Sequence, residues 1–227
     1  MRKIRDTVIS AYDFVINLGL YKFQNNSASR RVRLINAFSM FAMIVLTIYM
    51  PIFYYWGIGD LVWVSISQWM AYGLSLLFNY LRKFKVAKVI FISQLSLATM
   101  AFSSIMGEGV QLQLFYIPII NLSVVLFDSE QKLERFVTFV FPIVCFFTLE
   151  YVDYNILPRF ILEPQLEKFM RWTIIVVILI LNWIVISAFA KSSEVKEKKI
   201  HRLFDLSFAD RLDFEHRELD KQIKEKG

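Results

Sequence analysis

Long apolar runs fill this chain from residue 34 to residue 190 and stop abruptly at Lys191. The runs FSMFAMIVLTIYMPIFYYW and FMRWTIIVVILILNWIVISAFA approach or exceed the ~20 residues that cross a hydrocarbon core. Hydrophobic residues make up 56% of the chain, above the ~45–50% of soluble domains. A chain that crosses a bilayer must satisfy its backbone internally, as helices or as a closed barrel. The sequence therefore predicts an integral membrane protein.

Short polar breaks between the apolar runs predict six spans. Barrel strands would show ~10-residue alternation of apolar and polar residues, and the runs here are continuous, so we expect an all-α, polytopic bundle. The fourth span is the weakest, because it is short and contains Pro118. The predicted spans are 34–56, 60–81, 86–106, 112–127, 136–152 and 169–190.

The pattern divides the chain into three predicted domains. Residues 1–29 form an amphipathic helix and a turn, residues 30–190 the transmembrane bundle, and residues 191–227 a charged cytoplasmic helix. The first helix either lies on the cytoplasmic membrane surface or packs against the protein itself. Its predicted turn is QNNSAS, and its apolar residues at helical spacing are Ile4, Val8, Ala11, Tyr12, Val15 and Leu18.

Lysine and arginine placement predicts the orientation of the spans, since cytoplasmic segments are enriched in both. Arg31, Arg82 and Lys132 stand for three basic segments that all fall on one side of a six-span arrangement. The tail after Lys191 falls on the same side. Both termini are therefore expected in the cytoplasm. The net charge of +6 follows from these flanking cations, so we expect no nucleic-acid partner.

The charged tail carries a single apolar stripe that is close to a coiled-coil seam. We interpret the stripe as a signal-transmitting helix and the contact of a parallel homodimer; the alternative is a solvated helix. Its residues are Ile200, Phe204, Phe208, Leu212, Leu219 and Ile223.

Motifs for catalysis or metal binding are absent from the sequence. We find no Gly-rich phosphate loop, HExxH, CxxC or GxSxG, so we assign no catalytic and no metal-ligating residue, and no cofactor is identified. The spans also lack a clear charge at mid-membrane depth, which argues against a pump or a proton-coupled transporter.

Uncharged polar residues inside the spans and carboxylates near the outer face are the candidate ligand-binding residues. The alternative for the first group is interhelical hydrogen bonding, worth about 0.6–2 kcal/mol each. The alternative for the carboxylates is solvation by water and headgroups. The candidates are Gln68, Gln94, Glu108, Tyr116, Asn121, Glu150 and Asp153.

Four segments together resemble a known module: NLGL, RRVRLIN, LFYIPIINLSVVLFD and FPIVCFFTLEYVDY. They are similar to the amino-terminal six-helix membrane module of bacterial sensor histidine kinases and of membrane-bound class III adenylate or guanylate cyclases. The resemblance implies a location in the bacterial cytoplasmic membrane and a kinase or cyclase output domain. Since the sequence here ends at Gly227, that output would be supplied in cis by a longer protein or in trans by a partner.

These observations favour a sensor or regulatory module that passes a signal from the membrane or outer face through the sixth span to a cytoplasmic output. The chain would then be the membrane domain of a signalling enzyme. A small transporter or channel, a membrane-embedded enzyme, and a stand-alone protein acting on a partner remain alternatives.

Overall fold

The structure is a computed structural model that describes residues 10, 13–20, 26–127, 130–187 and 189–190. The chain divides into a compact unit, Met1–Val185, and a second unit, Ile186–Gly227, of which few residues are described. The fold below is that of the first unit. The predicted charged helix 191–227, with its whole apolar stripe, lies outside the described residues, as does most of the predicted surface helix.

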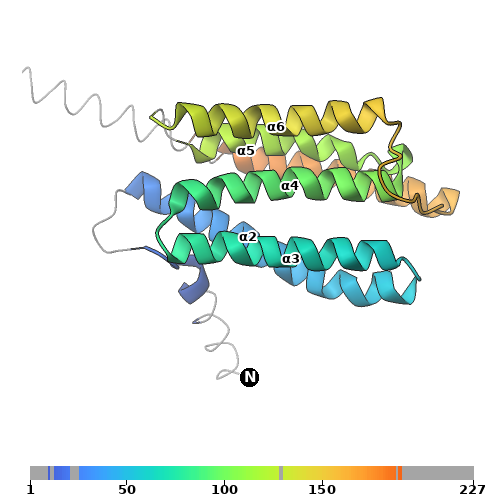
Figure 1. Cartoon of the computed structure of the whole chain (residues 1–227), viewed down its shortest axis with the longest axis horizontal. Coiled ribbons are helices and arrows are strands. Elements are labelled where there is room, and N and C mark those ends of the chain that lie inside the picture. The colour runs from blue at the N-terminus through green and yellow to red at the C-terminus, as the bar shows by residue number, and fades with distance from the viewer. Residues whose placement is uncertain (1–9, 11–12, 21–25, 128–129, 188, 191–227) are drawn as a thin grey trace, which may run out of the picture. The chain divides into compact units, whose positions relative to one another are not determined.

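The described residues form helices joined by short turns and, before the last helix, by a loop over residues 152–163, which confirms the all-α fold class (Figure 1). Two 3₁₀ turns, Glu108–Val110 and Leu112–Phe115, connect α4 to α5. The helices are α2 (Asn26–Tyr55), α3 (Gly59–Tyr80), α4 (Phe84–Met106), α5 (Tyr116–Leu126), α6 (Lys132–Tyr151) and a last helix, Pro164–Ser187.

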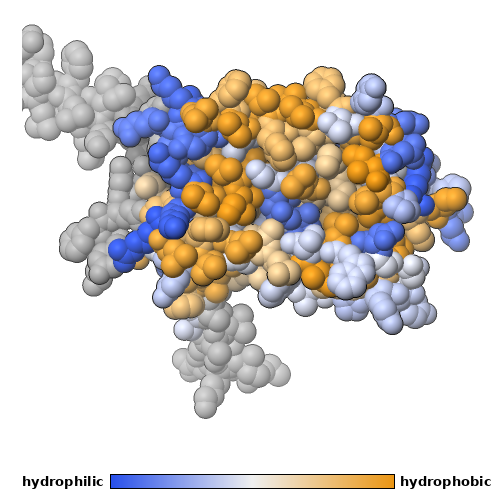
Figure 2. All heavy atoms as spheres, in the orientation of Figure 1, coloured by the Kyte–Doolittle hydropathy of each residue, from blue (hydrophilic) through white to orange (hydrophobic). Residues whose placement is uncertain are grey.

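Each of the labelled helices packs against its neighbour in the chain, and α4 also contacts α2 and α6 (Figure 1). This places α4 between the α2–α3 pair and the α5–α6 pair. On the face shown in Figure 2, hydrophilic residues gather at the two ends of the bundle, with a mainly hydrophobic surface between them. A hydrophobic face with polar ends is what a bilayer requires.

Four helices are long and apolar enough to cross a membrane: Ala28–Tyr55, Gly59–Tyr80, Phe84–Met106 and Pro164–Ser187. The protein is therefore a helical membrane protein with several spans. The apolar helix Leu112–Leu126 is shorter, and α6 carries Glu134, Arg135 and Glu150 near its ends. Length and composition thus support four of the six predicted spans.

Two local predictions are corrected by the structure. We expected a turn at QNNSAS, but α2 already begins at Asn26, because Asn and Ser are favoured at helix starts and neither Pro nor Gly interrupts the segment. We also expected Pro118, which lies well inside the predicted span 112–127, to weaken that span. Instead α5 begins at Tyr116, so Pro118 lies in the first turn, where its missing N–H removes no intrahelical bond.

Phe91 of α4 is the largest fully buried side chain of the core. Its ring lies 6.5 Å from that of Phe38 on α2 and 6.1 Å from that of Tyr72 on α3, measured between centroids. One side chain therefore joins three helices. A second apolar cluster, built around Leu61, Ile105 and Val110, fills the end of the bundle where α3 begins and α4 ends.

We expect Phe91→Ala to destabilise the protein by about 3 kcal/mol, because it opens a cavity where three helices meet. The matched control is Leu74→Ala on the exposed face of α3, which removes similar apolar atoms without opening a cavity. Unfolding by denaturing detergent in mixed micelles would measure both. Equal losses for the two variants would contradict this account of the core.

Candidate functional site: a polar seam inside the bundle

Helix α3 turns polar residues inward and apolar residues outward. Its buried residues are Leu61, Ser65, Gln68, Tyr72, Ser75 and Asn79, which follow one another at intervals of four and three. That spacing places them on one helical face. The exposed side chains of the same helix include Trp63, Met70 and Leu74. This distribution is the reverse of a soluble helix, and it suits a helix with lipid on its outer side.

We call the inward face of α3 and its polar partners the polar seam: Ser65, Gln68, Tyr72, Ser75, Asn79, Asn36 of α2 and Gln94 of α4. At mid-length, the amide nitrogen of Gln94 donates to the amide oxygen of Gln68. Toward the end of the bundle that carries Arg82 and Lys83, Ser75 Oγ donates to the carbonyl of Ala87 at 3.2 Å. At that end, Asn79 Nδ2 donates to Asn36 Oδ1 at 2.8 Å. The seam thus joins α3 to both of its neighbours.

Small side chains on the inward face of α3 let the helix lie close to its neighbours. Ser65 and Ser75 are both fully buried, and serine at a helix interface lets two backbones come near each other. Among the described residues, the buried Ser65 Oγ takes part in no hydrogen bond within the protein, and the buried Asn79 Oδ1 accepts none. The seam therefore holds hydrogen-bonding capacity that its present pairs do not use.

The predicted residues Tyr116 and Asn121 lie on α5, away from the seam. The hydroxyl of Tyr116 donates to the carbonyl of Ser96 at 3.2 Å, and its ring meets Phe146 edge-on. Asn121 Nδ2 donates to Asn182 Oδ1 of the last helix at 3.0 Å. Of the four uncharged candidates inside the spans, the structure therefore brings only Gln68 and Gln94 together. Ligand binding by any of the four stays a prediction.

The predicted carboxylates gather at the opposite end of the bundle from Asn36, around Tyr154. Glu108, Glu150 and Asp153 are all exposed, and the Tyr154 hydroxyl donates to the Glu150 carboxylate. Burial, and then this hydrogen bond, raise the pKa of the Tyr154 phenol well above its ordinary value. The phenol therefore stays protonated at neutral pH and remains a donor to Glu150.

Ser104 of α4 fastens the loop that follows α6. Its hydroxyl donates to the Tyr154 carbonyl at 3.0 Å and accepts from the N–H groups of Ile156 and Leu157, at 3.0 and 2.8 Å. Nearby, Phe160 N–H donates to the Ile105 carbonyl at 2.7 Å. A hydroxyl has one donor and two acceptor positions, so Ser104 is fully used in holding the loop over this end of the bundle.

The groups of the seam can form and exchange hydrogen bonds. Its side chains are hydroxyls and amides, and no group of three His, Cys, Asp or Glu residues able to hold a metal occurs in the described part of the chain. Cys145 is buried among apolar side chains. The seam can exchange hydrogen-bond partners, either between helices or with a small polar molecule, without moving a proton.

Sequence reasoning identified Gln68 and Gln94 of the seam but missed its other members: Asn36, Ser65, Tyr72, Ser75 and Asn79. The signal that identifies the seam is the three-four-three-four spacing of five polar residues, from Ser65 to Asn79, within an otherwise apolar span. Residues at that spacing lie on one side of α3, and the apolar residues between them, such as Met70 and Leu74, lie on the other side. For Asn36 no such series exists, because only its contact with Asn79 reveals its role.

Comparison of the chain with protein-family models, curated proteins and solved structures finds no match.

A double-mutant cycle on Gln68 and Gln94 tests the seam. Each single change to Leu leaves one amide in the bundle without its partner, so we expect a loss of about 1–2 kcal/mol in the free energy of unfolding. The double variant should lose less than the sum, since neither amide remains. Detergent unfolding measures all three. Strictly additive losses would show that the two amides do not interact.

Proposed function

We propose that this chain is a membrane-embedded sensor or regulatory module, in which a change of helix packing passes through the last helix to an output in the cytoplasm. The observation that carries the proposal is the narrow attachment of Pro164–Ser187 to the bundle. A signal module needs a helix that can move without unfolding the rest, and a helix held along one face meets that need.

The inner face of the last helix is a short series of apolar side chains. Ile174, Ile178 and Val185 are buried, whereas Val176, Leu179 and Trp183 face outward. Only 11% of its most apolar stretch is buried, compared with 44% for α4. Sliding or rotating this helix therefore disturbs fewer packed side chains than moving α4 would.

Asn121 and Asn182 supply the polar link between the last helix and α5. An amide pair of this kind fixes the register of two helices, yet such bonds inside membranes average only about 0.6 kcal/mol. Arg171 Nε adds a second link, to the Gly109 carbonyl at 2.7 Å. Two packings that keep this link and change only the Asn121–Asn182 contact can then differ little in free energy. A ligand or a bilayer property shifts such an equilibrium by its differential affinity for the two states.

The polar seam is the proposed place where a signal enters. Its uncharged amides and hydroxyls favour a neutral hydrogen-bonding ligand, or a rearrangement of α3 against α4, over transport of an ion. The output would be a kinase or cyclase domain joined to this chain or a partner protein, and the protein would act as a homodimer.

We also propose that Leu112–Leu126 and α6 cross the bilayer, giving six spans with both termini on the cytoplasmic side of a bacterial inner membrane. Both helices lie alongside α4, and each contacts α4 as well as the other (Figure 1). At ~1.5 Å per residue, Leu112–Leu126 falls short of the ~30 Å core, so it would depend on its neighbours or on local thinning. The basic residues Lys83, Lys85 and Arg135 then lie on one side.

Insertions after Ser192, in a fusion to a dimerisation-dependent reporter, test the signalling proposal. Two extra residues turn a continuing helix by ~200°, whereas seven turn it by only ~20° in the opposite sense. We expect the two-residue insertion to change reporter output severalfold and the seven-residue insertion to preserve it. Membrane insertion should be equal for both.

Equal output from both insertions would contradict transmission through the last helix. Substrate-dependent flux in liposomes that is unaffected by removing residues 194–226 would instead favour a transporter.

Accessibility of single cysteines tests the six-span arrangement in a Cys145→Ala background. Glu130→Cys decides the outcome, because residue 130 lies in the connection between Leu112–Leu126 and α6. With Lys83→Cys and Gly57→Cys as markers of the two sides, we expect Glu130→Cys to react with an impermeant thiol reagent from the side of Lys83→Cys. Reaction from the side of Gly57→Cys would show that Leu112–Leu126 does not cross.

A further inference from the structure

We infer that residues 16–20 form a strap that ties the amino-terminal segment to the paired ends of α2 and α3, so that this segment is a second input to the bundle. The inference goes beyond the proposed function, because it concerns the opposite terminus from the last helix. It rests on the contacts of one asparagine and one glycine.

Asn36 holds the strap from inside α2. Its Nδ2 group donates to the carbonyls of Ile16 at 3.0 Å and Leu18 at 3.1 Å. Its Oδ1 accepts from Asn79 Nδ2 at 2.8 Å. Asn36 and Asn79 are both fully buried. The same side chain therefore binds the strap and pairs α2 with α3, so the two contacts cannot change independently.

Gly19 is required at the place where the strap touches α3. Its φ of +80° is a conformation that side chains disfavour. A Cβ atom built there would lie 2.0 Å from the Asn79 carbonyl oxygen and 2.8 Å from the carbonyl carbon. Both obstacles are backbone atoms. Any side chain at position 19 must therefore displace the strap from the end of α3.

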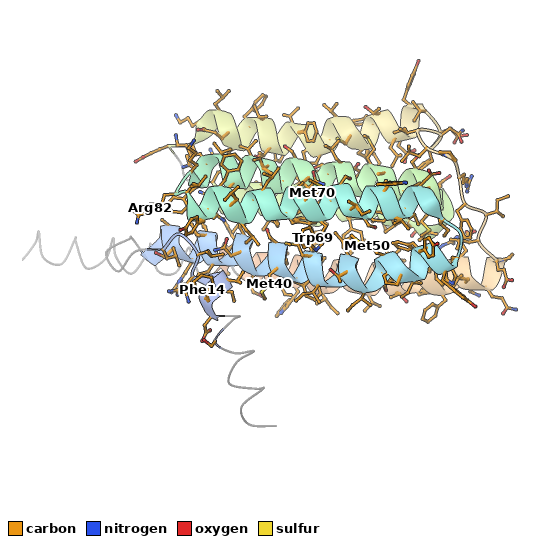
Figure 3. All side chains as sticks on the ribbon, turned by 60° about the horizontal axis from the view of Figure 1, so that its bottom comes forward. Phe14, Met40, Met50, Trp69, Met70 and Arg82 are labelled. Atoms are coloured by element: carbon orange, nitrogen blue, oxygen red, sulfur yellow. The ribbon has the colours of Figure 1, made fainter. Side chains whose placement is uncertain are left out.

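The outer side of the strap is open to its surroundings. Arg33 Nε donates to Asn17 Oδ1 at 3.0 Å, in an exposed position. Phe14, just before the strap, has 70% of its side chain exposed. Figure 3 shows Phe14 at the same end of the bundle as Arg82 of the α3–α4 turn. A displacement of the chain just before residue 16 therefore acts directly on Asn36, because Asn36 bonds to the Ile16 and Leu18 carbonyls.

Release of the strap has a defined consequence for α3. Two buried N–H donors of Asn36 would lose their acceptors, and buried donors without partners are unstable. Water must then enter between the ends of α2 and α3, or Asn36 must leave Asn79. In either case the end of α3 opens, including the N–H groups of Leu81, Arg82 and Lys83 that bond back to residues 77–79.

Hydrogen exchange of the full chain in nanodiscs tests this coupling. Gly19→Ala should speed exchange about tenfold or more in residues 13–20 and, together with them, in residues 79–83. Two matched controls exist. Gly57→Ala also has a positive φ, of +72°, but meets no atom within 4 Å, and Gly73→Ala meets none in mid-α3. Neither control should alter either segment.

Asn17→Ala is the second variant, since it removes two exposed side-chain bonds and leaves the contacts of Asn36 in place: Arg33 Nε to Asn17 Oδ1, and Asn17 Nδ2 to the Asp13 carbonyl. We expect it to raise exchange in both segments by a smaller factor. Unchanged exchange in residues 13–20 for both variants would overturn the strap itself. Faster exchange in residues 13–20 with residues 79–83 unchanged would overturn the coupling to α3.

Discussion

The amides of Asn36, Gln68 and Asn79 cannot be hydrated by a hydrocarbon core, and this requirement organises the bundle. In lipid a buried polar group must find its partner within the protein. Gln68 finds it on α4 and Asn79 finds it on α2. These partners fix which face of α3 points inward. Once that face is fixed, Trp63, Met70 and Leu74 on the other side of α3 must point outward, where lipid accepts them without a specific contact.

Two other features of the bundle depend on the same requirement. Ser104 holds the loop after α6 by using all three of its hydrogen-bonding positions, and Asn36 holds the turn before α2 by using three of its own. Each end of the bundle is therefore fastened by one buried polar side chain. The last helix has two polar links to the bundle, Asn182 to Asn121 and Arg171 Nε to the Gly109 carbonyl, but only a small share of its apolar stretch is buried. That small buried share is why we propose the moving role for it.

Sequence patterns predicted the all-α membrane fold and the bounds of α3 and α4, whereas α2, α6 and the last helix begin several residues before the predicted spans. Apolar runs of about 20 residues leave a chain few alternatives in lipid, so α3 and α4 begin and end within two residues of the prediction. The start of α2 and the place of Pro118 were not predicted, because Asn, Ser and Pro occur both in turns and in first helical turns. Pairings such as Asn36–Asn79 join residues 43 positions apart, and spacing along a single span cannot reveal them.

The central claim is that α3 presents a polar face to the bundle and an apolar face to lipid. Photolabelling in nanodiscs with a membrane-soluble diazirine, read at residue level by mass spectrometry, tests it most directly. The account predicts labelling at Trp63, Met70 and Leu74, and protection at Ser65, Gln68 and Ser75. Labelling of Gln68 and Ser75 at the level of Trp63 and Leu74 would contradict it.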